Sequence, residues 1–421
     1  MAGPRRRAGP SSEGGSVSEV VLPEQQVERG VQGKRIVLVV MDGLGGLPHP
    51  LSGRTELESA RTPHMDALAA RGSLGMTVMV KEGITPGSGP GHLALFGYDP
   101  IKTVMGRGAL SALGVGIELQ PGDVAARLNL ATFDDAGLVG DRRAGRPSDA
   151  DAARVVARLQ QAVRAPAGVA VTFVPEKEHR VVLHLRGKGL GGAALSDTDP
   201  LETGRAELPV EALDTESKAT AEVVRVVLAQ VRMILADEPR MNGVLARGFA
   251  AFERIATMEE RFGLRGLALA KYPMYRGVAR LVGMEVPGVP VSNEDTVALL
   301  ERSWGSHDFY FLHFKDTDTR GHDGDFDGKV AAIEEVDALI PRVTALKPDV
   351  VIITGDHSTP ATLKEHSWHH VPVLMASSWP RPTATEFGES TCRLGDLGLV
   401  HASDLIPLAL AHAGRLVKYG A

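Results

Sequence analysis

The amino-acid sequence predicts an α/β fold in which a mostly parallel sheet is sandwiched by helices and interrupted by an inserted α+β domain. The first observation is a set of continuous apolar runs, typical of strands buried on both faces, at residues 35–40, 308–314, 349–354 and 371–376. The second is a helical pattern over residues 328–346, which suggests a strand, helix, strand crossover. The third is a change to alternating patterns between about residues 118 and 261, which indicates a separate unit.

The predicted elements follow in order from residue 35. The run RIVLVV leads to Asp42 and a glycine-rich loop, so we expect it to deliver a carboxylate to the sheet edge where α/β proteins bind ligands. Residues 62–72, TPHMDALAARG, predict a short helix with a threonine cap, a proline in its first turn and a closing glycine. Residues 85–92, TPGSGPGH, predict a loop, because proline lacks an N–H donor and glycine is costly inside a helix.

The middle of the chain predicts a domain of different construction. Residues 168–187 alternate between apolar and polar side chains, as strands with one buried face do. Residues 218–238 have the apolar spacing of a long helix, whereas residues 195–209 are polar and typical of a loop or lid. The expected organisation is a core interrupted by a cap: residues 31–117 and 262–421 for the core, and residues 118–261 for the cap.

Composition excludes several classes of function. The net charge of -6 argues against nucleic-acid binding, which needs a basic face. Cys392 is the only cysteine, so an intrachain disulfide and a cysteine-based zinc site are excluded, as suits a reducing cytoplasm. No apolar run approaches the roughly 18 residues that span a bilayer, so we expect no membrane partner. Residues 1–30 carry an arginine triplet without the apolar segment of a signal peptide, and we expect a disordered tail.

Three polar clusters adjoin the apolar runs of the C-terminal half. Asp318 and His322 stand four residues apart after the second run, and Asp356 and His357 are adjacent after the third. His366 precedes the fourth run. Carboxylate and imidazole groups at the ends of neighbouring strands are the donors that a divalent transition metal needs. Together with the carboxylate after the first run, they are numerous enough for two metal ions.

Each of these residues alone has an ordinary structural explanation. An isolated aspartate at a strand end usually caps a helix or turn, and a lone histidine is usually a hydrogen-bonded surface or core group. Several such residues at the edge of one sheet favour metal binding instead. The surplus groups are expected to support the ligands or to face solvent: Asp316, Asp323, Asp325, His369 and His370.

Longer motifs run through the chain from about residue 35 to residue 413. They are PGSGPGHLALFGYDP, GDVAARLNLATFDDAGLVGDRRAGR, DTDP, GHDGDFDGK and TGDHSTP. Together they resemble the cofactor-independent phosphoglycerate mutases of the archaeal type, a family of the alkaline phosphatase superfamily. The resemblance implies an alkaline-phosphatase-like core, an inserted cap that binds substrate, and two metal ions that activate a serine. It implies no requirement for 2,3-bisphosphoglycerate.

The resemblance also assigns ligands to the two metals. One would be held by Asp42, Ser88, Asp356 and His357, and the other by Asp318, His322 and His366. Each set mixes oxygen and nitrogen donors, which suits Mn²⁺ best, while Zn²⁺, Co²⁺ and Mg²⁺ each suit parts of such a site.

By its position in the motif, Ser88 matches the nucleophile that carries the phosphoryl group. A free serine hydroxyl is a weak nucleophile at pH 7, and coordination to a divalent cation lowers its pKa. Many archaeal relatives have an acidic residue after this serine, whereas this chain has Gly89, which removes one negative charge near the phosphate. Lys271 would neutralise the phosphoryl group, with Arg276 as an alternative, and Asp141 would be a proton shuttle or a ligand of a substrate hydroxyl.

Arginines in the predicted cap are candidates for binding the substrate. The planar guanidinium group binds carboxylate and phosphate in a bidentate way, although a single loop arginine is as often simply solvated. The candidates for substrate binding are His92, Arg142, Arg146, Arg180, Arg247 and Arg276.

The resemblance therefore implies an isomerase that interconverts 3-phosphoglycerate and 2-phosphoglycerate, in glycolysis and gluconeogenesis, through a phosphoserine, and we expect it in the cytoplasm. Its partner would be a small phosphorylated hydroxy acid, and the oligomeric state is left open. A phosphatase, a phosphopentomutase-like enzyme or a homoserine kinase-like phosphotransferase on the same scaffold is the alternative. A non-catalytic metal- or phosphate-binding protein is disfavoured, because the serine and the ligand set are intact.

Overall fold

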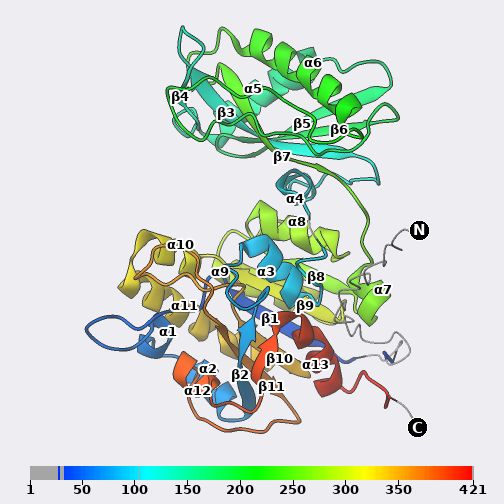
Figure 1. Cartoon of the computed structure of the whole chain (residues 1–421). Coiled ribbons are helices and arrows are strands. Elements are labelled where there is room, and N and C mark those ends of the chain that lie inside the picture. Colours follow the sequence, from blue (N-terminus) through cyan, green and yellow to red (C-terminus); the bar gives the residue numbers. More distant parts are fainter. Residues whose placement is uncertain (1–26, 29–32, 104, 420–421) are drawn as a thin grey trace, which may run out of the picture.

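The computed structural model describes residues 27–28, 33–103 and 105–419, which form two lobes (Figure 1). In the described chain, the sheet of the core lobe has seven strands in the order β12-β2-β11-β10-β1-β9-β8. Their bounds are β1 (Ile36–Met41), β2 (Gly72–Val78), β8 (Gly266–Leu269), β9 (Phe309–Phe314), β10 (Val350–Thr354), β11 (Val371–Ser377) and β12 (Gly398–His401).

The core sheet is mostly parallel, as predicted. β8, β9, β1 and β10 are parallel neighbours, and β12 is parallel to β2. β11, the predicted strand over residues 371–376, runs antiparallel to both of its neighbours. β9 and β10 are joined through a helix as expected, but they are not adjacent, because β1 lies between them.

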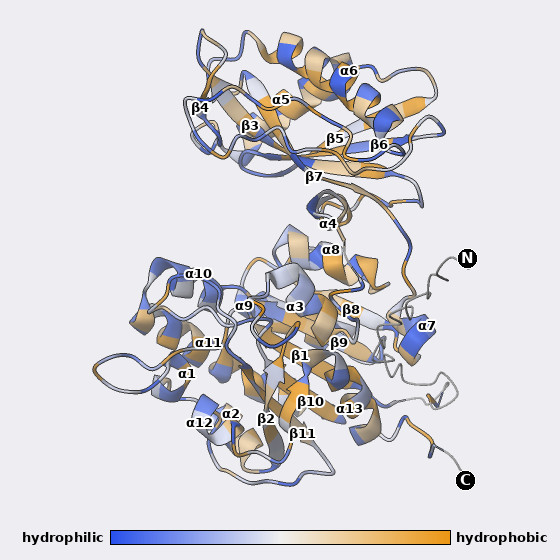
Figure 2. Ribbon diagram, in the orientation of Figure 1, coloured by the Kyte–Doolittle hydropathy of each residue, from blue (hydrophilic) through white to orange (hydrophobic). Residues whose placement is uncertain are grey.

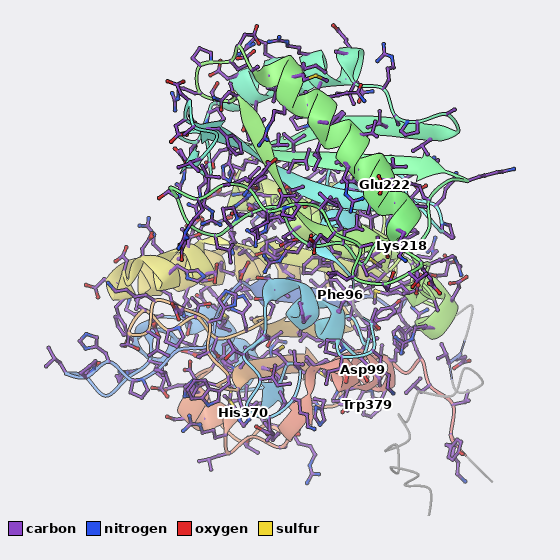
Figure 3. The ribbon with its side chains drawn as sticks, turned by 45° about the horizontal axis from the view of Figure 1, so that its top comes forward. Phe96, Asp99, Lys218, Glu222, His370 and Trp379 are labelled. Atoms are coloured by element: carbon purple, nitrogen blue, oxygen red, sulfur yellow. The ribbon has the colours of Figure 1, made fainter. Side chains whose placement is uncertain are left out.

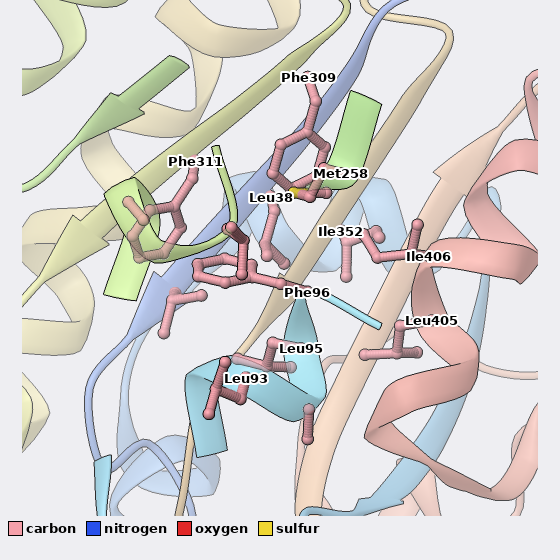
Figure 4. Close-up of a cluster of buried hydrophobic side chains, with 14 of the residues drawn as sticks. Leu38, Leu93, Leu95, Phe96, Met258, Phe309, Phe311, Ile352, Leu405 and Ile406 are labelled. Carbon is pink, nitrogen blue, oxygen red and sulfur yellow. The ribbon is translucent and has the colours of Figure 1, made fainter. Parts of the chain in front are cut away.

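Helices cover both faces of the core sheet (Figure 1). Alternate residues of β1 enter two separate apolar clusters, because successive side chains of a strand point to opposite faces. One cluster includes side chains of α3 (Ser88–Leu95), α7 (Met258–Phe262), α8 (Pro273–Leu281) and α13 (Leu405–His412), and Figure 4 shows part of it around Phe96. The other includes α1 (Glu56–Ser59), α2 (Pro63–Ala69), α9 (Asn293–Ser303), α11 (Phe326–Ala345) and α12 (Glu389–Cys392).

The second lobe is the predicted α+β cap. Its antiparallel sheet has the order β4-β3-β6-β5, with β7 paired to β3 on the other side. Its strands are β3 (Val124–Phe133), β4 (Val139–Asp141), β5 (Val169–Lys177), β6 (Arg180–Gly187) and β7 (Gly243–Ala251). α5 (Asp149–Ala162) and α6 (Lys218–Leu235) pack on one face, and α6 turns charged side chains such as Lys218 and Glu222 outward (Figure 3).

Hydropathy follows this architecture. The core strands are strongly apolar, whereas α6 of the cap has one apolar and one polar side (Figure 2). No helix in the described part of the chain has the length and apolar character that crossing a bilayer requires.

Two local predictions are wrong. Residues 85–92 are not wholly a loop, because Ser88 begins α3. Pro90 is tolerated there, since the first N–H groups of a helix have no partner within the helix. The helix predicted over residues 62–72 ends at Ala69, and Gly72 is the first residue of β2 instead of a helix-closing glycine. Thr62 caps this helix by position, without a side-chain hydrogen bond.

Two helices lie between the lobes, α4 (Arg107–Gly114) and α8 (Figure 1). They pack closely because glycines face the contact: a Cβ at Gly277 would lie 2.1 Å from the carbonyl oxygen of Leu110. Arg280 of α8 donates to the carbonyl of Leu113 at 2.6 Å. On its other side α4 packs against β3 of the cap, where a Cβ at Gly108 would lie 2.2 Å from the carbonyl oxygen of Ala125.

Most of the predicted N-terminal tail lies outside the described residues. Val27 and Glu28 are described, and both meet the C-terminal segment. Val27 is buried and forms a β-bridge with Leu416, and the backbone N–H of Glu28 donates to the carbonyl of Arg415 at 2.9 Å.

Candidate active site

Loops at one edge of the core sheet bring the predicted metal ligands together. β1 lies between β9 and β10, and the three strands are parallel, so their carboxyl ends share one edge. Asp42 follows β1, Asp318 lies in α10 (Asp316–Asp323) just after β9, and Asp356 and His357 follow β10. β11 runs in the opposite direction, so His366, which precedes it, reaches the same edge.

These side chains form two adjoining groups among the described residues, which we call the ligand groups. Asp42, Asp356 and His357 make the first group, and Asp318, His357 and His366 make the second. Within each group, one ligand-type atom from every residue lies within 4.8 Å of the others. His357 belongs to both groups, so two cations bound here would be neighbours.

The first group has the properties of a cation site. Asp42 and Asp356 are fully buried, and Oδ1 of the former and Oδ2 of the latter have no hydrogen-bond partner among the described residues. Burial raises the pKa of Asp42, but the hydrogen bond with His313, the nearby imidazole of His357 and the charge of Lys315 outweigh it and hold the pKa well below its usual range. Buried carboxylates with unpaired oxygens fit a divalent metal.

His322 lies beside the second group. Its Nε2 is 3.6 Å from Oδ1 of Asp318, and its ring centroid is 5.1 Å from that of His366. Its Nδ1 is 3.1 Å from the carbonyl oxygen of Lys364, an acceptor, so Nδ1 carries the proton. The lone pair of Nε2 is then free to bind a cation.

Ser88 lies at the junction of the two groups. Its Oγ is 3.1 Å from Nε2 of the shared His357. Gly87 is the N-cap of α3 and Ser88 its first residue, so a phosphoryl group on Ser88 would meet the positive end of the helix. A Cβ at Gly91 would lie 2.1 Å from the carbonyl oxygen of Asp356, so this glycine allows α3 to approach the ligand loop.

His92 is fully buried beneath the ligands, whereas the sequence predicted that it binds substrate. Its Nδ1 is 2.8 Å from the carbonyl oxygen of Ser88 and 3.2 Å from Oδ2 of Asp356. Burial lowers the pKa of His92, but the charge of the nearby Asp356 carboxylate outweighs it and raises the pKa above its ordinary value. The ring lies against that of Tyr275, at a centroid distance of 4.8 Å.

Lys315 joins the two groups, and sequence reasoning missed it. Its Nζ donates to Oδ2 of Asp42 at 3.0 Å, to the hydroxyl of Tyr275 at 3.0 Å and, in a short contact, to Asp318. Burial lowers the pKa of Lys315, but the two aspartates outweigh it, so the pKa is raised and the side chain stays charged. Lys315 directly follows a strand that leads to a predicted metal ligand, and this position in the sequence could have indicated its role.

Thr359 also contacts both groups. Its Oγ1 is 2.8 Å from Oδ1 of Asp318 and 2.9 Å from Nδ1 of His357. Because the single hydroxyl proton goes to the carboxylate, the imidazole must donate from Nδ1. The lone pair of Nε2 therefore faces Ser88.

Lys329 fixes the backbone behind these ligands. The side chain is fully buried, and its Nζ donates to the carbonyls of Gly43, Gly45 and Thr359 at 2.9 to 3.1 Å. Burial lowers its pKa. All three ammonium protons thus connect the loop after β1 with the loop after β10.

The cap presents a basic surface on the face of its sheet that α5 and α6 do not cover. Val124, Ala126, Leu128 and Leu130 of β3 enter the apolar cluster with those helices. The intervening positions Arg127 and Asn129 point to the other face. Arg127 pairs across the sheet with Arg247 of β7, and Asn129 pairs with Arg180 of β6. Like charges directly opposite in a sheet are unfavourable, which indicates an anionic ligand.

This face lines a cavity of about 280 Å³. Four predicted residues line it: Arg142, Arg146, Arg180 and Arg247. Sequence reasoning missed seven others: Arg127, Asn129, Arg143, Lys177, Glu178, His179 and Tyr272. The available signal was the alternation of two polar residues, Arg127 and Asn129, with apolar residues in β3. Arg142 also donates two hydrogen bonds to the buried carboxylate of Asp199, at 2.7 and 2.8 Å.

The remaining predicted residues lie outside this cavity. Asp141 accepts hydrogen bonds from the backbone N–H groups of residues 143 and 145, both at 2.7 Å, and so shapes the loop that carries the arginines. Arg276 is 8% exposed and donates to backbone carbonyls, including that of Pro287 at 2.9 Å. Lys271 donates to the side-chain oxygen of Asn293 at 3.2 Å, within the core.

A chain of contacts connects the cap cavity to the ligand groups. Arg180 makes a short hydrogen bond to the hydroxyl of Tyr272, the N-cap of α8. The ring of Tyr272 is 5.7 Å from that of Tyr275, whose hydroxyl contacts Lys315. The basic cavity and the ligand groups therefore both adjoin the start of α8.

Comparisons with known proteins show which family this chain resembles. Residues 69–241 match the family model described as 2,3-bisphosphoglycerate-independent phosphoglycerate mutase. A protein of Thermus thermophilus named as a probable member of that family is 50% identical, over 92% of this chain and 96% of its own length. One of Thermotoga neapolitana with the same name is 49% identical over the same shares.

Two solved structures resemble the whole molecule. A protein of Pyrococcus horikoshii has a TM-score of 0.78 and 29% identity, covering 93% of this chain and all of its own. The cofactor-independent phosphoglycerate mutase of Thermoplasma acidophilum has a TM-score of 0.69 and 26% identity, covering 90% of this chain and all of its own.

Proposed function

Because the chain belongs to the 2,3-bisphosphoglycerate-independent phosphoglycerate mutases, a family of isomerases, we propose that it interconverts 3-phosphoglycerate and 2-phosphoglycerate through a phosphorylated Ser88 and two divalent metal ions. The observation that carries this proposal is the position of Ser88 Oγ, 3.1 Å from the histidine that both ligand groups share. These substrates are intermediates of glycolysis and gluconeogenesis, so we place the enzyme in the cytoplasm.

The proposed metal ligands are the two groups at the sheet edge with Ser88 and His322 added. The first metal would be held by Asp42, Ser88, Asp356 and His357, and the second by Asp318, His322 and His366. Bound cations would lower the pKa of the serine hydroxyl and neutralise charge on the phosphoryl oxygens. The mixture of oxygen and imidazole donors favours Mn²⁺.

The reaction requires two displacements at phosphorus. In the first, Ser88 Oγ gives up its proton and forms a bond to phosphorus, the bond from phosphorus to the C3 oxygen breaks, and that oxygen takes up a proton. In the second, the C2 hydroxyl gives up its proton and bonds to phosphorus, the bond from phosphorus to Ser88 Oγ breaks, and Ser88 regains a proton. Lys315, held between Asp42 and Asp318, is suited to stabilise the charge that develops on the transferring group.

The cap would hold the glycerate portion between the two steps. Arginines suit its carboxylate, and those of the cap cavity adjoin the start of α8. Lys271 and Arg276 belong to the core lobe, where Lys271 donates to Asn293 and Arg276 donates to backbone carbonyls. We propose that Lys271 supports the site through its charge and Arg276 through its hydrogen bonds to the backbone.

The decisive test is Ser88→Ala at saturating Mn²⁺, with Ser306→Ala, an exposed serine, as the control. Formation of 2-phosphoglycerate, coupled to enolase, should fall roughly 10³-fold or more in Ser88→Ala and stay unchanged in the control. Mutase activity near the wild-type rate in Ser88→Ala would contradict the assigned nucleophile. Release of free phosphate by the wild type, without 2-phosphoglycerate, would favour a phosphatase.

A further inference from the structure

We propose that Asn129 and His179 of the cap bind the hydroxyl groups of glycerate while the phosphoryl group is on Ser88, and thereby favour its return to glycerate over its transfer to water. This inference rests on the proposed mutase function. It assigns to two neutral side chains a role that the sequence predicted for Asp141.

Both residues belong to the cavity face of the cap sheet. Asn129 lies on β3 directly across from Arg180 of β6, and His179 immediately precedes that strand. The carbonyl of His179 accepts a hydrogen bond from the N–H of Leu130 at 2.7 Å, so its backbone position is fixed by the sheet. Asn129 is 6% and His179 is 4% exposed, and both line the cavity of about 280 Å³.

Each residue has a buried polar atom that makes no hydrogen bond within the described chain, although the carboxylate of Glu178 lies 3.8 Å from Nδ1 of His179. Among the described residues, neither Oδ1 of Asn129 nor Nδ1 of His179 has a hydrogen bond. Leaving such a group unsatisfied costs about 1–3 kcal/mol. Two of these groups in one cavity indicate that a ligand completes their hydrogen bonds.

The charge around these residues specifies which part of a ligand they suit. The cavity is rich in arginine and also contains Lys177, and these side chains have only donors. They suit carboxylate or phosphate, but they cannot accept a hydrogen bond from a hydroxyl group. Asn129 and His179 are neutral groups with acceptor atoms, so they can.

His179 remains neutral at physiological pH. Burial and the charges of Arg180 and Arg143 lower its pKa to about 4. A neutral imidazole has one nitrogen that accepts a hydrogen bond and one that donates a hydrogen bond. It can therefore bind a hydroxyl group, and it does not compete with the arginines for carboxylate or phosphate.

The other acceptors of this region are less suited. Asp141 does not line the cavity, and its carboxylate oxygens accept from two backbone N–H groups of its own loop. The hydroxyl of Tyr272 already accepts from Arg180. Glu178 is partly exposed and lies at the hairpin turn between β5 and β6.

Holding the hydroxyl groups matters at one stage of the reaction. After the first displacement the glycerate has a carboxylate and two hydroxyl groups and is no longer linked to phosphorus. If it leaves, water attacks the phosphoserine, the bond from phosphorus to Ser88 Oγ breaks, and inorganic phosphate is released. Groups that bind the hydroxyls therefore change the ratio of the two products.

The test compares His179→Leu and Asn129→Leu with wild type at saturating Mn²⁺. ³¹P NMR with 3-phosphoglycerate measures 2-phosphoglycerate and inorganic phosphate in the same sample. We expect the fraction released as inorganic phosphate to rise at least about tenfold in both variants. His179→Asn, whose amide can replace one ring nitrogen, should restore most of the wild-type ratio, and His64→Leu, an exposed histidine of the core, should leave it unchanged.

A binding measurement covers the case in which the variants turn over too slowly. Calorimetry with D-glycerate should show at least about tenfold weaker binding in His179→Leu, with inorganic phosphate binding unchanged. Arg127→Met should instead weaken binding of both. A wild type that forms 2-phosphoglycerate, with variants whose phosphate fraction and glycerate affinity equal wild type, would overturn the inference and leave the proposed function intact. A wild type that forms none would overturn the proposed function itself.

Discussion

At the scale of single residues, the hydroxyl of Thr359 contacts both proposed ligand groups. It contacts Asp318 of one ligand group and His357, which both groups share. Groups that orient metal ligands typically contribute 10- to 100-fold to metal affinity. Valine has the same shape as threonine but lacks the hydroxyl group, so it cannot make these hydrogen bonds.

We therefore expect Thr359→Val to weaken Mn²⁺ binding roughly 10- to 100-fold. Thr77→Val is the matched control, because the Thr77 hydroxyl is also buried but donates to the carbonyl of Val371 at 3.0 Å, away from the ligands. Competition with a fluorescent chelator measures both affinities. Equal affinities in the two variants would show that Thr359 does not orient the ligands.

His179 predicts a pH dependence of stability. The ring protonates near its ordinary pKa of 6.5 in the unfolded chain, but in the folded protein burial and the neighbouring arginines lower the pKa to about 4. Between these values the unfolded state binds more protons, so stability falls as the pH falls from 6.5 toward 4. His179→Asn should flatten this slope in urea unfolding followed by circular dichroism. An unchanged slope would mean that folding does not lower the pKa of His179.

At the scale of elements, α3 illustrates why local patterns misled. Proline and glycine in residues 85–92 predicted a loop, yet Ser88 begins a helix because Pro90 occupies the first turn, where no backbone hydrogen bond is lost. The glycines serve close packing instead. Gly91 lies against the backbone of Asp356, whereas Gly89 has room, since its Cβ would lie 3.5 Å from Leu110.

A matched pair of substitutions on α3 tests this explanation. Gly91→Ala should lower the free energy of unfolding by about 1–3 kcal/mol, because its methyl group would overlap the carbonyl of Asp356 and displace that ligand. Gly89→Ala should be neutral or stabilising by up to about 1 kcal/mol, since alanine is the better helix former. Urea unfolding measures both. Similar effects at the two positions would contradict close packing at Gly91.

At the scale of the whole molecule, the two lobes have separate apolar cores. Both ligand groups lie in the core lobe. The three tryptophans of the chain, Trp304, Trp368 and Trp379, are all in the core lobe. Tryptophan fluorescence therefore reports the unfolding of the lobe that holds the proposed metals.

Mn²⁺ at 100 times its Kd should stabilise this lobe by about 2.7 kcal/mol, because it binds the folded state and relieves the repulsion among buried carboxylates. This corresponds to an increase of roughly 5–10 °C in the Tm followed by tryptophan fluorescence. Removal of metal with EDTA should reverse it. A Tm that does not respond to Mn²⁺ or EDTA would contradict metal binding at the sheet edge.

The sequence by itself determined the elements with strong periodicity and the motifs with short spacing. The buried strands, the long helices and the inserted α+β cap follow from the repeat of apolar side chains, and the proposed ligands stand beside the strand ends. Periodicity is a local property, so it can be found without knowledge of the fold.

Only the tertiary structure decided which of these residues meet. The strand order β10-β1-β9 places Asp42 between Asp318 and Asp356, and the reversed direction of β11 brings His366 to the same edge. Lys315 became part of the site through this order, and Asn129 became part of the cap cavity through its register against β6. Register and strand order depend on contacts between residues far apart in the chain, and no local pattern contains them.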